Sequence, residues 1–578
     1  MSAFCQKLRR SLAVDLPHKS HLWLSLSLAV ALIYGLQSLH YAFSRELLIQ
    51  DDARQHIFWL QRFVNPALFP NDLIADYFQS VAPPGFTIFY YIFAKIGVNP
   101  LLLSKLLPCF LGLITTLYCF GVSLQLFPLP AAAFLSTLLL NQGLWMEDDL
   151  ASATPRAFLY PLLLAFLYYL LRCSFGGALL SLALLGLFYP QMALLAIALL
   201  TVRLFSGQQG RLRWVKAKAH YQLWAAGLLV VGLILLPYKL DASEFGPLVT
   251  VAQARSLATF NFVEGYYGRS FFFSDNPLIF WLVGPRSGLL FWGIMSPLVL
   301  AGFALPWLLR RPDKFPAVKQ VSPQIDLLAQ IVSASLGLFF LAHLLLFQLH
   351  FPNRYVYHSM RIVLAIAAGI SLFIYFEALL KRRFPSLRQK GAIALQLIFV
   401  TLLLAAPFSP ELTVVNQLFK PAREPVLHQF LQQQPVDSLV VSLDKEAENI
   451  PTFAQRSVLV AREYAFPYHW GYYTQFRQRV QTLAAAQYSA DLQQVRQFIQ
   501  QFGADFWLLD KQSFTPDYVT DNRLLREFQL VDTVLMALKN PEALVLPKLI
   551  RPCTTLETES RVLLDASCVS QQIQANSP

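Results

Sequence analysis

Long apolar stretches separated by short basic or polar segments dominate the first 408 residues of the chain. Several of these stretches reach the ~20 residues that a helix needs to cross the hydrocarbon core of a bilayer. The 578 residues are 56% hydrophobic and only 14% charged, whereas a soluble domain carries roughly 25% charged residues. The pattern therefore predicts a polytopic α-helical membrane protein and excludes a soluble one.

The order of the spans follows from apolar length and from the rule that loops rich in Lys and Arg stay in the cytoplasm. The segment before the first span is basic, which predicts a cytoplasmic N-terminus. Residues 176–205 are broken at Tyr189–Pro190, as in one kinked span or a hairpin, and the basic residues of 203–218 require the hairpin. The expected spans, about eleven in all, are 21–43, 100–126, 131–146, 157–172, the two halves of 176–205, 222–238, 288–309, 327–349, 362–380 and 391–408.

Two parts of the chain are expected on the outer side of the membrane. Residues 44–98 are amphipathic and form the first outer loop of a membrane domain that covers residues 1–408. From residue 409 the chain becomes rich in Gln, Asp and Glu, and apolar strands at Ser438–Leu443 and Phe506–Leu509 alternate with a helical pattern at Leu492–Phe502. This alternation predicts a small extracytoplasmic α/β domain over residues 409–578.

Charge and cysteine content refine this picture. The formal net charge is +12, but the Lys and Arg residues lie in short clusters between apolar stretches, which indicates membrane topology and not a nucleic-acid surface. No Walker loop, nucleotide-binding glycine fingerprint or serine nucleophile elbow is present in the sequence. Cys553 and Cys568 would be able to pair if the C-terminal domain is extracytoplasmic.

The first outer loop contains the sequence Gln50-Asp51-Asp52-Ala53-Arg54-Gln55-His56, which continues helically through Trp59 and Arg62. Asp52 and His56 are four residues apart and share a helix face. Two adjacent carboxylates can bind a divalent cation or take a proton from an acceptor hydroxyl. A solvated helix start is the plain alternative, because Asp favours the first turn.

A second acidic cluster, Glu147-Asp148-Asp149, directly follows an apolar span. Three acids at the end of a span are costly unless they face water or a cation, although an ordinary exposed loop also accommodates them. Both clusters are expected on the outer side, so we expect them to converge on one polar cavity. Mg²⁺ or Mn²⁺ is a candidate occupant at Asp51, Asp52, Asp148 and Asp149, although the pattern requires no cofactor.

Basic residues at the outer mouth of the later spans are candidates for phosphate binding. Arg354 and Arg361 lie in the expected outer segment His350–Arg361 with His358, and arginine suits bidentate capture of phosphate. An interfacial anchor of aromatic and basic residues is the alternative. The outer loop 239–277 adds Arg269 among aromatic rings, an environment that suits a sugar, a lipid chain or simple packing.

The first third of the chain resembles a known superfamily. The outer acidic segment is followed by Pro83-Pro84-Gly85-Phe86, Gly97-Val98-Asn99 and Lys105-Leu106-Leu107-Pro108. Over residues 20–170 this order resembles the GT-C superfamily of polyprenyl-phosphate-sugar-dependent glycosyltransferases, and within it the protein O-mannosyltransferase and aminoarabinose transferase branch. The resemblance implies that Asp51 or Asp52 is the catalytic acid, that Arg54 is its following arginine, and that Asp148 or Asp149 belongs to the second acidic motif.

The sequence departs from that branch in two places. Val81-Ala82 precede the proline pair where the branch has a basic residue, and Lys105 replaces an arginine. The missing basic residue implies that Arg354 or Arg361 contacts the donor phosphate. The C-terminal part lacks the Trp-Trp-Asp-Tyr-Gly motif of oligosaccharyltransferases, so transfer to a peptide asparagine is not expected.

The resemblance implies an inverting glycosyltransferase at the outer face of the cell (inner) membrane, with a polyprenyl-phosphate-linked sugar as donor, membrane lipid around it, an unidentified acceptor and no nucleic acid. Asp51 or Asp52 would act as general base, and Arg54, Arg354 or Arg361 would stabilise the departing phosphate. A transporter or flippase of a lipid-linked saccharide and a non-catalytic membrane scaffold are the alternatives. The charges cluster at the surface and no repeated halves are visible, which disfavours the transporter.

Overall fold

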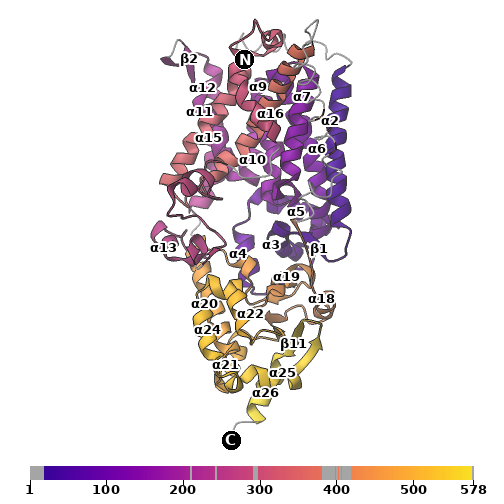
Figure 1. Cartoon of the computed structure of the whole chain (residues 1–578), viewed down its shortest axis with the longest axis vertical. Coiled ribbons are helices and arrows are strands. Elements are labelled where there is room, and N and C mark those ends of the chain that lie inside the picture. Colours follow the sequence, from indigo (N-terminus) through magenta and orange to yellow (C-terminus); the bar gives the residue numbers. More distant parts are fainter. Residues whose placement is uncertain are drawn as a thin grey trace.

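The structure of the protein is a computed structural model that describes residues 19–208, 211–240, 244–263, 265–290, 297–380 and 418–575, with residues 398, 401 and 405 between them. The molecule is elongated (Figure 1). A bundle of helices forms one end, and residues 418–575 form a smaller unit of strands and helices at the other. The segments that connect bundle helices and carry the two predicted acidic clusters lie between these two parts.

Five helices in the described part of the chain are long and apolar enough to cross a membrane, which confirms the predicted membrane class. Shorter apolar helices fill the remainder of the bundle. The bundle helices are α2 (Lys19–Ala42), α6 (Pro100–Leu126), α7 (Pro130–Trp145), α9 (Leu159–Leu171), α10 (Phe175–Phe188), α11 (Pro190–Val202), α12 (Lys218–Leu240), α14 (Leu305–Leu309), α15 (Asp326–Leu344) and α16 (Asn353–Leu380).

Three expected spans need comment. Residues 176–205 contain two helices, α10 and α11, which meet at Tyr189 and pack against each other as in the predicted hairpin. That each of them crosses the membrane stays a prediction. Of the span expected at 288–309, the structure describes residues 288–290 and 297–309. Residues 297–309 form a 3₁₀ segment (Pro297–Ala304) followed by α14. The span expected at 391–408 lies outside the described residues, apart from three isolated positions.

The first loop is helical where its sequence predicts a helix. Strand β1 (Leu48–Gln50) leads into α3 (Asp51–Ile57), and a 3₁₀ turn continues it over Phe58–Phe63. The Gln50 side chain caps α3 by accepting a hydrogen bond from the Ala53 amide, which satisfies one of the amides that a helix start leaves without a partner. Two further helices, α4 (Leu73–Ser80) and α5 (Pro84–Lys95), complete the loop.

Residues 418–575 contain a five-stranded sheet in the order β10-β11-β9-β7-β8. Strand β7 pairs in parallel with both β8 and β9, whereas β11 is antiparallel to β9 and β10. Strands β7 and β9 and helix α21 lie at the residues where the sequence predicts strands and a helix. The elements are β6 (Phe419–Pro421), α18 (Pro425–Gln432), β7 (Leu439–Val441), α19 (Ile450–Phe453), β8 (Ser457–Val458), α20 (Trp470–Gln487), α21 (Leu492–Phe502), β9 (Phe506–Asp510), α22 (Pro516–Asp521), α23 (Arg523–Glu527), α24 (Val531–Ala537), α25 (Val545–Cys553), β10 (Thr554–Glu557), β11 (Arg561–Asp565) and α26 (Ala566–Ala575).

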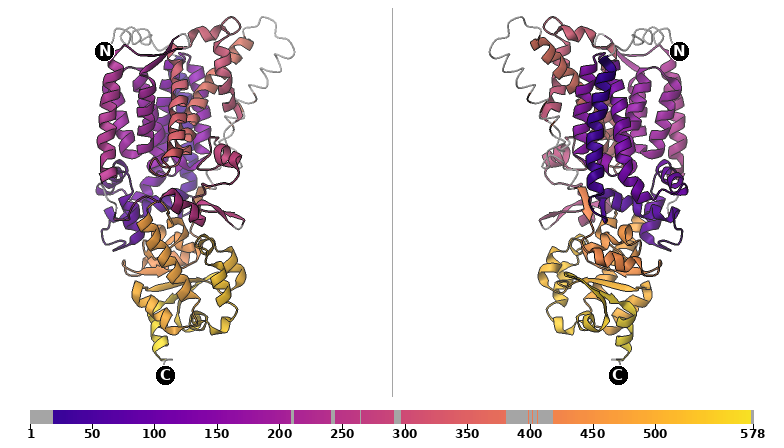
Figure 2. Two further views of the ribbon diagram at one scale, coloured as in Figure 1. Left: turned by 90° about the vertical axis from the view of Figure 1, so that its left-hand side faces the viewer. Right: turned by 90° about the vertical axis from the view of Figure 1, so that its right-hand side faces the viewer.

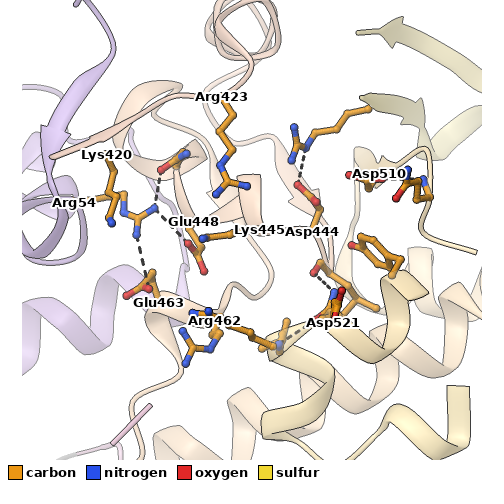
Figure 3. Close-up of a pocket in the computed structure, with 18 of the residues that line it drawn as sticks. Arg54, Lys420, Arg423, Asp444, Lys445, Glu448, Arg462, Glu463, Asp510 and Asp521 are labelled. Carbon is orange, nitrogen blue, oxygen red and sulfur yellow. Dashed lines mark hydrogen bonds and ion pairs between the residues drawn. The ribbon is translucent and has the colours of Figure 1, made fainter. Parts of the chain in front are cut away.

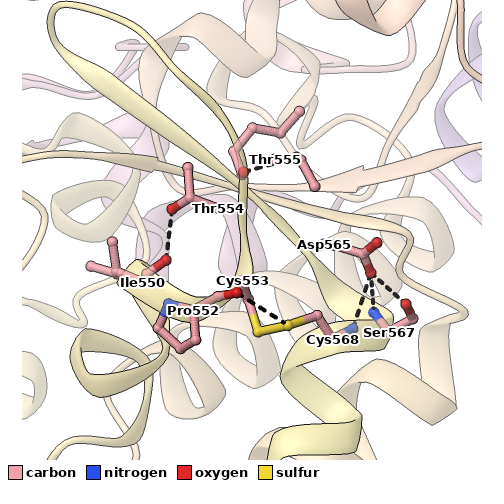
Figure 4. The surroundings of a disulfide bond; sticks show 9 residues. Ile550, Pro552, Cys553, Thr554, Thr555, Asp565, Ser567 and Cys568 are labelled. Carbon is pink, nitrogen blue, oxygen red and sulfur yellow. Dashed lines mark hydrogen bonds between the residues drawn. A yellow bond between two sulfur atoms is a disulfide. The ribbon is translucent and has the colours of Figure 1, made fainter.

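A disulfide bond joins Cys553 and Cys568, the pairing that the sequence left open (Figure 4). Their Cα atoms are 5.5 Å apart, within the range that disulfide geometry allows. Cys553 ends α25 and Cys568 lies in the first turn of α26, so the bond joins the two helices that flank the β10–β11 hairpin.

Backbone and aromatic contacts join the two parts of the molecule. Strand β1 of the first loop pairs antiparallel with β6, so that Ile49 lies opposite Lys420. The Tyr77 ring of α4 stacks on Tyr472 of α20 with centroids 3.7 Å apart. The described parts of residues 244–290, which include α13 (Val251–Ser256) and the short strands β4 (Phe262–Val263) and β5 (Tyr266–Tyr267), lie between the bundle and the sheet (Figure 2).

Helices α7 and α16 pack closely at the centre of the bundle because Gly369 faces Ser136. A Cβ atom at position 369 would lie only 2.8 Å from Ser136 Cα. Small residues permit this approach between membrane helices. We therefore expect Gly369→Ala to lower stability by ~1–3 kcal/mol, because α7 and α16 must move apart, and to lower the thermal unfolding midpoint in detergent.

Gly337→Ala is the matched control for this substitution. Gly337 is in the interior of α15, and a Cβ atom added there would meet no other atom within 4 Å. Alanine there gains up to ~1 kcal/mol of helix propensity without a clash. An unchanged midpoint for Gly369→Ala would contradict the assigned packing.

Candidate functional site

One guanidinium brings the two predicted acidic clusters together. Arg156 lies in the 3₁₀ turn Pro155–Phe158 that leads into α9. Its Nη2 forms a short ion pair with Asp52 and lies 3.1 Å from Asp148, and its Nε lies 3.0 Å from Asp149. Asp52, Asp148 and Asp149 therefore lie together around Arg156, and their convergence on one polar cavity stays a prediction.

The turn that carries these carboxylates is held in an unusual backbone conformation. Asp148 and Asp149 begin the single-turn helix α8 (Asp148–Ala151), and the chain then reverses at Ala153 with a positive φ of 54°. That conformation is costly for a residue with a side chain. The Tyr90 hydroxyl donates a 3.0 Å hydrogen bond to the Ala153 carbonyl and thereby holds the turn.

Asp149 is the buried member of the cluster, with a side chain only 1% exposed. It accepts hydrogen bonds from Arg361 Nη1 at 2.7 Å and from the Tyr160 hydroxyl at 2.8 Å, and His358 Nδ1 lies 3.5 Å away. Burial alone would raise the pKa of Asp149, but Arg156, His358 and Arg361 together hold it well below its ordinary value.

The side chains of the other carboxylates are more exposed to solvent and pair with fewer cations. The side chains of Asp52 and Asp148 are 29% and 33% exposed. Burial raises the pKa of Asp148 to about 6; Arg156 opposes this shift and the like charge of Asp52 adds to it. Burial also raises the pKa of Glu147, which precedes α8 and interacts with Arg361. Asp52 and Asp148 are therefore the members of the cluster that are partly accessible to solvent.

The basic side chains of α16 have unused hydrogen-bonding capacity. Nε and Nη2 of Arg361 and Nε2 of His358 are buried and have no hydrogen-bond partner in the described part of the chain; the same holds for Nε of Arg354. Buried polar groups are normally paired, so these atoms indicate a place for a polar ligand group or water. The segment His350–Arg361 was expected to be an outer segment, but α16 already begins at Asn353, and these side chains lie on its first turns.

Asp51 and Arg54 belong to a different set of contacts. Arg54, 4% exposed, pairs with Asp51 at 2.8 Å and with Glu448 at 3.3 Å, and donates to Asn449 at 2.7 Å. Figure 3 shows its guanidinium between Glu448 and Glu463. Neighbouring residues of a helix project ~100° apart, so Asp52 reaches Arg156 while Asp51 faces residues 418–575. The phosphate-binding role of Arg54 stays a prediction, because its contacts are structural.

The two glutamates around Arg54 differ strongly in acidity. Burial and the neighbouring Glu463 raise the pKa of Glu448 to about 7, although Arg54 opposes this. Burial also acts on Glu463, but Arg269 and Arg54 outweigh it and lower its pKa to about 2. The junction therefore contains one carboxylate that is firmly ionised and one that is close to its titration point at neutral pH.

His56, His350 and Arg269 lie in aromatic surroundings outside the acidic cluster. The His56 ring packs edge-on against Phe78 and Phe466 and forms no hydrogen bond with Asp52 in the described structure. Burial, with Arg156 and Arg269 nearby, lowers the pKa of His56 to about 3, so the ring is neutral. Burial likewise lowers the pKa of His350 to about 3. Arg269 pairs with Glu463 at 3.1 Å and covers the Phe466 ring.

Among the described residues, no group of three or more His, Cys, Asp and Glu side chains is arranged to hold a metal ion. Arg156 lies between the carboxylates that were predicted to bind a cation, and Asp51 is turned toward Arg54. A divalent cation at Asp52, Asp148 and Asp149 would therefore have to displace the Arg156 guanidinium.

Sequence reasoning missed two central residues, Arg156 and Tyr160. A signal for the first was present, because an arginine at the start of an apolar span is costly unless it has an acidic partner, and Arg156 follows the cluster of acids closely. Tyr160 carried no comparable signal, since aromatic residues are common at the ends of membrane helices.

No protein-family model matches the chain, and a search of the curated proteins found no match. Among solved structures, the apo form of the oligosaccharyltransferase of Archaeoglobus fulgidus is similar with a TM-score of 0.56 and 13% identity, over 90% of this chain and 73% of that one. The same enzyme tethered to an acceptor peptide containing the NVT sequon gives a TM-score of 0.54 and 12% identity, over 88% and 72% of the two chains. Its complex with an inhibitory peptide and a dolichol-phosphate gives 0.50 and 12%, over 87% and 71%.

An identity this low shows a shared fold and no more. The chain accordingly has a fold similar to that of the archaeal oligosaccharyltransferase.

Proposed function

We propose that this chain is an integral membrane glycosyltransferase that moves a sugar from a polyprenyl-phosphate-type lipid donor to an acceptor. The observation that carries the proposal is the Arg156 guanidinium shared by Asp52, Asp148 and Asp149. The similar fold of an oligosaccharyltransferase that binds a dolichol-phosphate, a lipid phosphate of the proposed donor class, supports it further.

In the proposed reaction, Asp52 is the general base. Its carboxylate takes the proton of an acceptor hydroxyl while the hydroxyl oxygen attacks the anomeric carbon of the donor sugar. The bond between that carbon and the phosphate oxygen breaks, and the electron pair leaves with the lipid phosphate. Attack on the face opposite the phosphate inverts the configuration. Arg156 orients Asp52 and, with Asp148, sets its basicity.

The donor phosphate is proposed to lie against α16. Arg361 offers two buried N–H groups without a partner, and Nε of Arg354 is also unpaired within the described structure. Guanidinium groups suit phosphate oxygens because their donors form a planar fork. Arg54, which the sequence resemblance places at the phosphate, is proposed instead to hold α3 against residues 418–575.

The membrane arrangement belongs to the same proposal. The N-terminus is placed in the cytoplasm, and the domain over residues 409–578 outside the cell (inner) membrane, with about eleven spans between them. The Arg156 cluster then lies at the outer mouth of the bundle. Membership in the protein O-mannosyltransferase and aminoarabinose transferase branch is supported by the sequence motifs of the first third of the chain.

Replacing the proposed base is the first test. Asp52→Asn keeps the shape of the side chain but cannot take a proton, so transfer from a radiolabelled polyprenyl-phosphate sugar in proteoliposomes should fall by roughly 10²–10⁴-fold. Asp51→Asn is the matched control, and a much smaller loss is expected because Asp51 pairs with Arg54. Full activity of Asp52→Asn would refute the assignment. Translocation of the lipid-linked sugar without transfer would favour a flippase, and neither activity would favour a scaffold.

The acidity of Asp148 predicts a pH dependence. Below its pKa of about 6, Asp148 takes up a proton, Arg156 loses one of its anionic partners, and Asp52 is held more tightly and becomes a weaker base. Activity should therefore fall as the pH decreases through this value. In Asp148→Asn the inflection near pH 6 should be absent, as measured by kcat/KM between about pH 4.5 and 8. An unchanged inflection would show that another group titrates there.

Removal of divalent cations tests the role of Arg156. Because its guanidinium already neutralises the carboxylates that a cation would bind, transfer activity should survive dialysis against EDTA with less than about a twofold loss. Loss of activity that Mg²⁺ or Mn²⁺ restores would show that a cation displaces Arg156 in the working enzyme.

A further inference from the structure

A cavity of about 720 Å³ lies between α3 and the sheet of residues 418–575 (Figure 3). Asp444 and Lys445, which follow β7, and Gln512, which follows β9, line it. These strands are neighbours and parallel. The chain continues from β7 to β8 at one edge of the sheet and from β9 to β10 at the other edge. Open α/β sheets bind ligands in the crevice outside the carboxyl ends of strands that diverge in this way.

Two of the carboxylates that line the cavity form hydrogen-bonded ion pairs with arginines. Asp444 accepts a hydrogen bond from Arg561 Nε at 2.7 Å, and Asp51 accepts one from Arg54 at 2.8 Å. These pairs fix the walls of the cavity. Further ion pairs hold other charged residues of its lining, namely Lys420, Glu448, Arg462, Glu463 and Asp521.

Three cations of the cavity, Arg423, Lys445 and Arg523, form no ion pair in the part of the chain that the structure covers. Figure 3 shows the Arg423 side chain directed toward Lys445, whose own side chain extends toward Glu448. Burial lowers the pKa of Lys445, and Arg423, Arg523 and Lys420 lower it further, although Glu448 opposes them. Cations that lie close together without forming ion pairs favour the binding of an anion between them.

The opposite side of the cavity is acidic. Figure 3 shows Asp510 and Asp521 across the cavity from Arg423 and Lys445. Asp517 also lines the cavity and forms no ion pair with any residue that the structure describes. Ionised carboxylates only accept hydrogen bonds, so this side suits a ligand group rich in hydroxyls.

We propose that this cavity binds a phosphorylated saccharide. The phosphate lies among Arg423, Lys445 and Arg523, and the sugar hydroxyls donate hydrogen bonds to Asp517 and its acidic neighbours. The volume is within the range of about 300–1,000 Å³ that small-molecule sites occupy. The proposal concerns binding alone and does not depend on the transfer reaction at Arg156.

Binding of glucose 6-phosphate to the full-length protein in nanodiscs, measured by calorimetry, tests the proposal. We expect Lys445→Met and Arg423→Met each to weaken binding by roughly tenfold or more, because a charge-assisted phosphate contact is lost. Lys445→Arg should retain most of the affinity. Lys511→Met is the matched control, since Lys511 is an exposed cation that pairs with Glu557 and does not line the cavity.

The acidic side is tested separately. Asp517→Asn should weaken the binding of glucose 6-phosphate and leave the binding of inorganic phosphate unchanged. Unphosphorylated glucose should bind neither to the wild-type protein nor to Asp517→Asn. Tighter binding of a phosphorylated disaccharide than of glucose 6-phosphate would identify a glycan as the natural ligand, and the reverse would identify a free sugar phosphate. The proposal would be overturned if neither glucose 6-phosphate nor the phosphorylated disaccharide bound at millimolar concentration. Equal affinity of the wild type and Lys445→Met for glucose 6-phosphate would also overturn it.

Discussion

An arginine at the start of a membrane helix is stable only where carboxylates neutralise it, and Arg156 has three of them. Asp149, the most buried of the three, also pairs with Arg361. Asp52 and Asp148 pair only with Arg156 among the residues that the structure describes. The surplus negative charge therefore lies at the two carboxylates with the greatest exposure. Within the cluster, Asp149 is thus the buried carboxylate, and Asp52 and Asp148 are the two that are accessible to solvent.

The short helix α3 separates two polar centres that the sequence presents as one. Asp52 contacts Arg156 in the bundle, and Asp51 contacts Arg54 and the wall of the cavity beside the sheet. Since α3 has only seven residues and is held by the Gln50 cap, by β1–β6 pairing and by the Arg54 contacts, the placement of Asp52 depends on residues 418–575. The part of the chain farthest from Asp52 in sequence is thus a determinant of its position.

The spans, the two acidic clusters and the strands β7 and β9 could be predicted because hydropathy and alternation are local properties of the chain. The partners within the site could not be predicted in the same way. Arg156 and Asp52 are 104 residues apart, and Arg54 and Glu448 are 394 apart. The helical spacing of Asp52 and His56 suggested a shared polar face, but Phe78 and Phe466, the latter from the distant C-terminal part, surround the histidine ring instead.

The pairing of β1 with β6 has a consequence for biosynthesis. During translation Leu48–Gln50 emerges long before Phe419–Pro421, so the ribosome must add most of the membrane helices while β1 still lacks its partner. An unpaired strand edge invites association with other chains. The β1 edge of the nascent protein therefore stays without its strand partner until Phe419–Pro421 has been synthesised.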